Sequence, residues 1–404
     1  MTEKMILDAV HAGVGEAEDL DWKAAVDEIK DPKEFAKDVA AMANTLGGII
    51  VFGVREDGAE HASELVGVAN PQSQVQSLRG RAAMVRPFVP ALRVYSVPLS
   101  QPDLAGTHVI VVEVPRSAEA PHLVPQTKES WGLPRRRGSD TDWLGESDLE
   151  SAYAARFQRR RSAEEQLAEL ADQLLSDRLL HTDTSIWVTV SASCSMPSTV
   201  TTSRVVDGTR TEPSMLAALD LLPEGNMLRD VFTIASPRAG LRRAVVSTDI
   251  PYTGTSTRGH IELLHDGSFV GALNAGFAEP VDGTHFVVQA RLESAVRDLL
   301  TVAVLHADRR HADGILQVRV SVALSDRLPS AQLALTNQRY TRETPQPVPN
   351  SITLRRIVPV TAETPLADLV STARAREQLV RQLALDLVHQ FAVTSLTALS
   401  TTTG

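Results

Sequence analysis

The sequence predicts an α+β fold arranged as two domains, and three observations lead to this prediction. The chain has 404 residues, whereas one domain usually holds about 100–200 residues. In the first half, segments with amphipathic helical spacing alternate with short segments that are typical of strands. A similar mixture begins again at Ile186–Val190. We therefore expect a mixed sheet with helices, followed by a second mixed α/β domain.

The first expected elements are a helix over residues 3–12 and a strand over residues 19–23. In the strand, Leu20 and Trp22 alternate with charged neighbours. Alternation places successive side chains on opposite faces, so this strand should be half buried.

The clearest helix follows at residues 32–46. Asp31 is a good N-cap, and Pro32 suits the first helical position. Apolar residues recur on one face of this helix; they are Phe35, Val39, Met42 and Leu46. Gly47 and Gly48 then end it, because glycine readily adopts the conformations that stop a helix.

The rest of the first half alternates between strands and helices. The unbroken apolar run Ile49–Val54 predicts a buried strand. We expect a helix at 71–86, strands at 92–98 and 107–114, a loop at 131–143, and a helix from 146 through 161.

The domain boundaries are placed from these patterns. We expect a first domain at 1–158, a helical connector at 159–181, a second domain at 182–394 and a disordered tail at 395–404. The tail is rich in Ser and Thr, which favours disorder at a terminus. Within the second domain we expect strands at 186–190 and 315–324, several strands in 241–290 with turns at Thr253 and Asp266, and helices at 213–222, 291–307 and 364–394.

The charge of the chain limits the kinds of nucleic-acid site it can hold. The formal charge is −10, so the whole chain is not a polycation that coats nucleic acid, and any such site must be a local patch. Residues 79–137 form such a basic patch, since their nine Lys or Arg and four Asp or Glu give a local charge of +5.

Cysteine content and hydropathy predict a cytoplasmic protein without a membrane partner. A single cysteine, Cys194, excludes an internal disulfide and fits a reducing compartment. We expect it to be an inert buried thiol. Apolar stretches in the sequence are shorter than the ~18 residues that a membrane span needs.

Acidic residues flank the two strands expected at 19–23 and 49–54. Glu16 and Asp21 lie on either side of the first strand's start, and Glu56 and Asp57 follow the second. If the two strands pair, and if Glu16 precedes its strand, these carboxylates can converge. Carboxylates hold hard cations such as Mg²⁺ or Mn²⁺. The competing interpretation is that they are ordinary solvated carboxylates beside strands.

Three motifs in the first 150 residues resemble those of the Schlafen-type, AlbA-like family. The first is Glu16-Ala-Glu-Asp-Leu-Asp-Trp-Lys23, and the second is Ala41-Met-Ala-Asn-Thr-Leu-Gly-Gly48 followed by Val51–Glu56. The third is the loop Arg136-Arg-Gly-Ser139. Their order and spacing agree with the family across about residues 10–150, which implies a Schlafen AlbA_2 domain and nucleic-acid binding.

The resemblance also implies a catalytic site. Nuclease members of the family bind a divalent metal through three acids and cleave RNA, notably transfer RNA. Carried over by position, these acids are Glu16, Asp21 and Glu56, with Asp57 as the runner-up. Asp21 stands where the family has Glu, and Glu56 stands where it has Asp, so two carboxylates differ in length. Mg²⁺ or Mn²⁺ would be the cofactor.

Four basic residues are the expected phosphate contacts. Lys23 matches the family lysine, and the resemblance places Arg135, Arg136 and Arg137 in the later arginine loop. For Lys23, a solvated strand-end lysine is an equal alternative. Arginine forks suit phosphate oxygens, and phosphate contacts fix the register of a protein on nucleic acid.

Two classes of function follow. The first is a metal-dependent endoribonuclease acting on transfer RNA or structured RNA, with RNA favoured over DNA. The second is a non-catalytic DNA- or RNA-binding module, such as a transcriptional regulator or a defence-system sensor. An ATP-using switch is a third class, but the sequence lacks the G-x-x-x-x-G-K-[ST] motif. The resemblance implies one lobe of a two-lobed grip, so we expect a homodimer.

Overall fold

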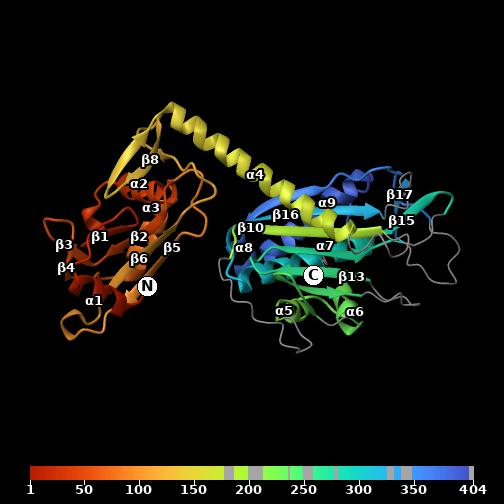
Figure 1. Ribbon diagram of the computed structural model, residues 1–404, viewed down its shortest axis with the longest axis horizontal. Coiled ribbons are helices and arrows are strands. Elements are labelled where there is room, and N and C mark those ends of the chain that lie inside the picture. Colours follow the sequence, from red (N-terminus) through yellow and green to blue (C-terminus); the bar gives the residue numbers. More distant parts are fainter. Residues whose placement is uncertain are drawn as a thin grey trace. The chain divides into compact units, whose positions relative to one another are not determined.

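The computed structural model describes residues 1–176, 186–198, 213–234, 237–248, 258–276, 281–324, 332–337 and 348–399. The chain divides into two compact units, Met1–Arg160 and Arg161–Gly404. Both contain helices and sheets (Figure 1), which confirms the α+β prediction.

The N-terminal unit follows the predicted order of elements. Its helices are α1 (Glu3–His11), α2 (Pro32–Ala43), α3 (Pro71–Ala82) and the start of α4 (Glu146–Leu174), with 3-10 helices η1 (Val26–Glu28) and η2 (Pro102–Leu104). Its strands are β1 (Leu20–Lys23), β2 (Gly47–Phe52), β3 (Val54–Glu56), β4 (Ala62–Leu65), β5 (Arg93–Pro98), β6 (His108–Pro115), β7 (Val124–Pro125), β8 (Trp131–Arg137) and β9 (Asp140–Leu144).

A four-stranded sheet of order β1-β2-β6-β5 forms the centre of this unit. The strands β1 and β2 pair in parallel, as the convergence of the acids requires, and the other pairs are antiparallel. One face packs on α2 and α3 through Phe35 and Leu78, and the other packs on α1 through Ile6. The residues Ile49–Phe52 are apolar because both faces of β2 are covered. The strand predicted over 49–54 breaks at Gly53, which adopts φ +102°, and Val54 begins β3 of a separate sheet.

The helix α2 is shorter than the sequence predicted. It ends at Ala43, and Leu46 is 60% exposed because it follows the helix instead of extending its apolar face. Gly47 adopts φ +81°, and a Cβ there would lie 2.5 Å from the backbone nitrogen of Arg116. Positive φ and close approach of another backbone both favour glycine at this position.

The arginine segment predicted as a loop is a β-hairpin. β8 and β9 pair in antiparallel register, with Arg136 opposite Thr141, and β7 pairs with the start of β8. The prediction was wrong because Gly138 and three consecutive arginines resemble loop composition, while the pairing that makes them a strand depends on the following residues.

The C-terminal unit also matches the expected mixture. Its helices are α5 (Pro213–Leu221), α6 (Met227–Ile234), α7 (Gln289–Arg309), α8 (Leu366–Ser371) and α9 (Ala373–Gln390). Its strands are β10 (Ile186–Met196), β11 (Arg238–Gly240), β12 (Arg243–Ser247), β13 (Gly259–Leu264), β14 (Phe269–Asn274), β15 (Thr284–Val288), β16 (Asp313–Leu324), β17 (Gln332–Thr336) and β18 (Val360–Pro365).

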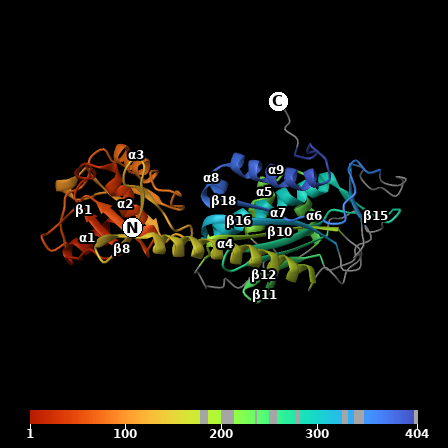
Figure 2. The same ribbon diagram turned by 90° about the horizontal axis from the view of Figure 1, so that it is seen from above.

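An antiparallel sheet of order β11-β12-β13-β14-β10-β16-β18 organises this unit. Figure 2 shows α7 and α9 on one side of the sheet and the C-terminal part of α4 on the other. The main core lies under the helices, and a smaller cluster joins Leu174 of α4 to Trp187 of β10. Cys194 is a buried free thiol, as predicted, and burial raises its pKa to about 12.

The structure differs from two predictions near the ends of the second unit. The helices expected on either side of residue 161 form one continuous helix, α4. The tail predicted to be disordered packs over residues 395–399, because the buried carboxylate of Glu293 accepts the backbone N–H groups of Thr397, Ala398 and Leu399 at 2.7–3.0 Å. Residues 400–404, residues 177–181 of the connector and the turn at Thr253 lie outside the described residues.

Helices that are long and apolar enough to cross a membrane do not occur among the residues that the structure describes.

Candidate functional site

The strand β1 brings Glu16 and Asp21 to one region of the N-terminal unit. Glu16 precedes the strand, as convergence requires, and its carboxylate accepts the backbone N–H of Trp22 at 2.8 Å. Trp22 points into the core beneath α1. Asp21 and Lys23 therefore share the opposite face of the strand.

Asp21 is buried and held by two cations. Its Oδ2 lies 2.7 Å from Nζ of Lys23, and its Oδ1 lies 3.0 Å from Nη2 of Arg136. Burying a carboxylate is costly unless it is paired and hydrogen-bonded, and these two contacts provide that pairing. Lys23 and Arg136, which were expected to bind phosphate, thus neutralise Asp21, which was expected to bind the metal.

Glu56 ends β3 and joins Glu16 at this site. Burial raises the pKa of Glu16 to about 7, and the charges of Asp21 and Glu56 add to the effect. Burial also raises the pKa of Glu56, although a hydrogen bond from the Glu16 carboxyl lowers it. Asp21 and Glu56 therefore lie close enough to Glu16 to raise its pKa.

The runner-up acid, Asp57, faces away from this group. Its carboxylate accepts the backbone N–H groups of Ala59 and His61 at 2.8 and 3.0 Å. These hydrogen bonds lower its pKa, and the side chain closes its own turn.

The described arrangement does not fit a divalent ion. Across the described ranges, no group of three or more His, Cys, Asp or Glu residues has the geometry to hold a metal. The physical reason is visible at Asp21, where Lys23 and Arg136 already occupy the two carboxylate oxygens. An ion bound by Glu16, Asp21 and Glu56 would compete with both cations.

The strand β8 separates the three consecutive arginines. Arg136 is 4% exposed and points inward to Asp21, whereas Arg135 and Arg137 are exposed. Arg137 pairs with Asp142 of β9, with its Nε 3.0 Å from Oδ2. Alternation along a strand explains this, since neighbours face opposite sides. The phosphate contacts expected of the three arginines stay a prediction, and the strand exposes Arg135 and Arg137 while it turns Arg136 toward Asp21.

The end of α2 fixes the hairpin in place. The side-chain amide of Asn44 donates to the backbone oxygens of His122 and Pro134, both at 2.9 Å. Thr45 Oγ1 accepts the backbone N–H of Arg136 at 3.1 Å. The Asn-Thr pair of the second motif thus positions the arginine strand as well as ending the helix.

A cleft of about 970 Å³ opens beside these residues. Five basic side chains line it; they are Lys23, Lys30, Lys37, Arg55 and Arg136. Six acids line it as well; they are Asp21, Asp31, Glu34, Asp38, Glu56 and Asp140. The buried Nε of Arg136 has no hydrogen-bond acceptor among the residues that the structure describes.

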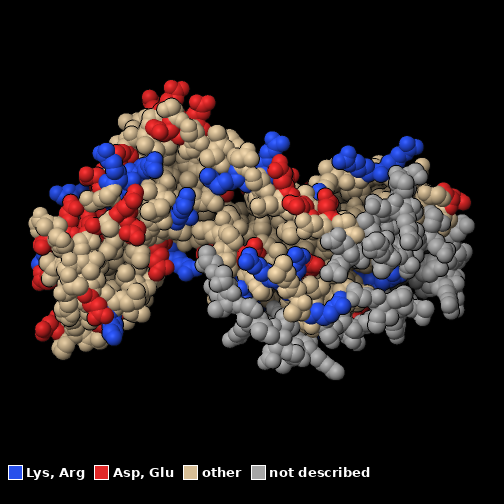
Figure 3. All heavy atoms as spheres, viewed as in Figure 1, with Lys and Arg blue, Asp and Glu red and all other residues tan. Residues whose placement is uncertain are grey.

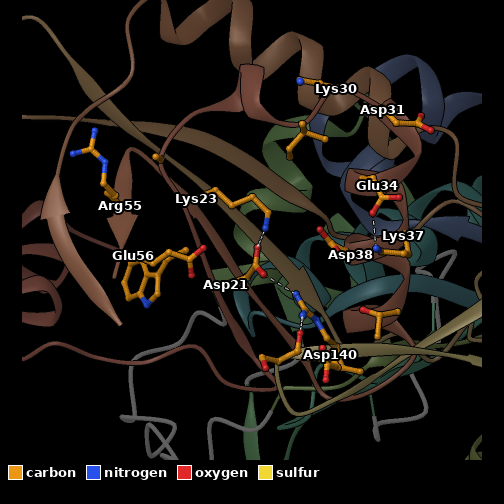
Figure 4. Close-up of a pocket in the computed structure, with 16 residues that line it drawn as sticks. Asp21, Lys23, Lys30, Asp31, Glu34, Lys37, Asp38, Arg55, Glu56 and Asp140 are labelled. Carbon is orange, nitrogen blue, oxygen red and sulfur yellow. Dashed lines mark hydrogen bonds and ion pairs between the residues drawn. The ribbon is translucent and has the colours of Figure 1, made fainter. Parts of the chain in front are cut away.

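Asp38 is a site residue that the sequence analysis missed. It reaches the cleft from α2, and in Figure 4 its carboxylate, Asp21 and Lys23 point toward one another. Burial raises its pKa to about 6, and the charge of Asp21 adds to this. The available signal was its helical spacing: Asp38 lies three residues after Phe35 and four before Met42, which places an acid beside the apolar stripe.

Residues 16–142 match the model of the Schlafen AlbA_2 family. The match confirms the resemblance for this part of the chain. No curated protein matches the sequence.

Two solved structures are similar to part of the chain. One is the N-terminal domain of a protein from Nitrosomonas europaea described as related to the ATP-dependent DNA helicase RecG, with 21% identity, a TM-score of 0.26, and coverage of 36% of this chain and 95% of that one. The other is a protein from Corynebacterium diphtheriae, with 16% identity and a TM-score of 0.24. That match covers 38% of this chain and 28% of the other.

Proposed function

We propose, from the Schlafen AlbA_2 domain at residues 16–142, that the N-terminal unit binds nucleic acid at its acid- and arginine-lined cleft. The observation that supports this most is the set of five basic side chains that line the cleft, among which Lys30 is exposed. Phosphate oxygens are suitable partners for them, because hydrogen bonds between a cationic side chain and a phosphate are charge-assisted and strong.

The charge pattern fits a local interface rather than a uniformly positive face. Lysines and arginines lie among aspartates and glutamates over the N-terminal unit in Figure 3. Lys30 is exposed beside the cleft. Such cations release counterions from a nucleic-acid backbone when they bind, which makes the affinity depend on salt.

Two acids affect binding through their protonation: Asp38 lines the cleft, and Glu16 interacts with Asp21 and Glu56, which line it. Ionised Glu16 and Asp38 would repel a phosphate, but burial raises the pKa of each, to about 7 and about 6. Both groups can therefore take up a proton near neutral pH when an anion approaches. RNA is the favoured ligand on the family resemblance, and a homodimer would supply a second copy of the cleft.

Cleavage of RNA is the second candidate function. The observation in its favour is the gathering of Glu16, Asp21 and Glu56, since carboxyls with raised pKa values, here Glu16 and Glu56, are typical of active sites. Mg²⁺ or Mn²⁺ would be the cofactor of this candidate, and binding it would require the ion pairs at Asp21 to open. Without metal binding or cleavage, the unit is a binding module.

Binding is tested with the full chain and fluorescently labelled transfer RNA, single-stranded RNA and duplex DNA in EDTA. We expect anisotropy to rise with protein concentration and affinity to fall with salt. Lys30→Ala should weaken binding and reduce the salt slope by about 1. Lys4→Ala is the matched control, because Lys4 is equally exposed on α1 and lies outside the cleft. Equal effects of the two variants, or no binding, would contradict the proposal.

Cleavage is tested by incubating transfer RNA with Mn²⁺ and the full chain, alongside Glu16→Ala. Loss of product in the variant supports the second candidate. Equal activity, or none in either protein, rejects it and leaves the binding module. Sedimentation at micromolar protein, with and without RNA, tests the homodimer, and a monomer throughout would reject it.

A further inference from the structure

The strand β8 of the β8–β9 hairpin carries an exposed indole ring and two exposed arginines. Trp131 is 48% exposed at the start of β8, and Arg135 and Arg137 are the exposed arginines of the same strand. All three have odd numbers and are exposed, although Leu133, which has the same parity and lies between Trp131 and Arg135, is buried. We use the name outer face for Trp131, Arg135 and Arg137.

The backbone beneath Trp131 is well fixed. Trp131 pairs with Pro125 of β7, and the next residues pair with β9. On the opposite face, Trp143 lies so close to Gly132 that a Cβ there would be 2.5 Å from the ring. Trp143 packs beside Gly132 although it is 46% exposed, and Trp131 is the tryptophan that lies on the strand of the exposed arginines. A ring held by a strand loses little entropy when it binds a ligand.

We propose that the outer face stacks an unpaired base of a single-stranded nucleic acid on Trp131. This inference rests on the proposed function and specifies its ligand. Base stacking on an aromatic ring needs a free π-face, and the bases of a duplex are stacked on each other. The structure therefore points to single strands, loops or ends in preference to a continuous duplex.

The two arginines suit the backbone that accompanies such a base. Arg137 already pairs with Asp142, but both side chains are exposed, at 78% and 43%. An exposed ion pair contributes little, so a phosphate can replace Asp142 at Arg137. The negative charges of Asp140 and Asp142, which lie opposite Arg137 and Arg135 in the hairpin, offset the positive charges of the two arginines. Stacking on the Trp131 ring therefore supplies most of the attraction for the nucleic acid, and the arginines orient its phosphates.

The tryptophans of this chain give a direct test. Trp22 and Trp187 are only 1% and 2% exposed, and the chain has four tryptophans in all. Changes in fluorescence on stacking must therefore come from Trp131 or Trp143. We expect an unstructured RNA oligonucleotide to quench the fluorescence of the full chain, and the same sequence as a duplex to leave it unchanged.

Variants assign the quenching to one ring. Trp131→Phe should remove most of the quenching, while Trp143→Phe, the matched control, should retain it. By anisotropy, Trp131→Ala should bind the single strand about 5- to 150-fold more weakly, the range reported for one stacked base, and Trp131→Phe should recover most of the affinity. An oligonucleotide with abasic sites should bind as weakly to the natural chain as the intact one binds to Trp131→Ala.

The outcomes separate this inference from the proposed function. If single-stranded RNA binds but Trp131→Ala has unchanged affinity, the stacking inference is overturned and nucleic-acid binding stands. Equal quenching by the duplex also overturns it. If no nucleic acid changes the anisotropy, both fail. Calorimetric unfolding of each variant confirms that the exposed substitutions leave the fold intact.

Discussion

Arg136 and Asp21 form a buried ion pair between residues 115 positions apart, with Nη2 and Oδ1 at 3.0 Å. The pair joins the strand β8 to the strand β1 and lies at the cleft. It fixes the inward face of the hairpin, and it places a cation at the carboxylate that the family resemblance assigns to a metal.

Removing Arg136 should strongly destabilise the N-terminal unit. Arg136→Met leaves Asp21 buried with Lys23 as its one remaining cation among the contacts of the described chain, and breaking a buried pair costs about 3–5 kcal/mol. Arg137→Met is the control, because its pair with Asp142 is exposed and such pairs contribute about 0–1 kcal/mol. Scanning calorimetry of the unfolding transition measures both. Equal shifts would show that the buried pair has no special role.

Glu16→Gln should stabilise the N-terminal unit at pH 8, and the gain should fade as the pH falls. The carboxyl has a pKa of about 7 when folded, against 4.5 normally. It therefore binds its proton more tightly in the folded state, and the natural chain loses stability as the pH rises through this window. Glutamine stays neutral, so the difference is full above pH 7 and disappears below 4.5.

The comparison with the natural chain at each pH is essential here. Burial lowers the pKa of His122 to about 4, so that residue changes stability in the opposite direction as it titrates. The contribution of His122 to stability is the same in both proteins, so it cancels in the difference between Glu16→Gln and the natural chain. A difference that is constant from pH 5 to pH 8 would contradict the raised pKa of Glu16.

Mn²⁺ should leave the thermal midpoint of the N-terminal unit unchanged in the absence of nucleic acid. The cations at Asp21 compete with a metal, and an ion that binds the folded state stabilises it by about 2.7 kcal/mol at 100 times its Kd. A saturable rise in the midpoint that Glu16→Gln abolishes would refute this expectation and favour the hydrolytic candidate.

Gly47→Ala should destabilise the N-terminal unit by about 1–3 kcal/mol, the usual range for a strained backbone position. The added Cβ would lie 2.5 Å from the Arg116 nitrogen at φ +81°. Gly58→Ala is the matched control, since a Cβ at Gly58 meets nothing within 4 Å. Urea unfolding followed by circular dichroism compares the two. If both variants unfold alike, the crowding at Gly47 is unimportant.

Glu293→Gln should release the last described residues of the C-terminal unit. The amide nitrogen that replaces Oε2 cannot accept the backbone N–H groups of Ala398 and Leu399, while Oε1 can still accept that of Thr397. Hydrogen exchange at these amides should accelerate, with a loss of about 1.5–3 kcal/mol for each charge-assisted bond removed. Glu377→Gln, at an exposed position on α9, should change neither the exchange rates of these amides nor the stability. Unchanged exchange in Glu293→Gln would show that the carboxylate does not hold the tail.

The local sequence determined the order of most elements. Asp31 does accept the N–H of Lys33 as an N-cap, and Ile49–Phe52 of the predicted strand does lie inside the sheet, as part of β2. These features depend on residues within one turn of helix or one strand, so the signal is contained in short windows. The pairing of β1 with β2, on which the convergence of the acids depended, also proved correct.

The sequence by itself determined the α+β character, the helix that begins after Asp31, and the acids before and within β1. The tertiary structure alone decided that Arg136 turns inward to Asp21, that Asp38 reaches the cleft and that Trp131 stays outside. The physical reason is that hairpin pairing and helix packing set which way a side chain faces, and they join residues too far apart in sequence for any local pattern to record.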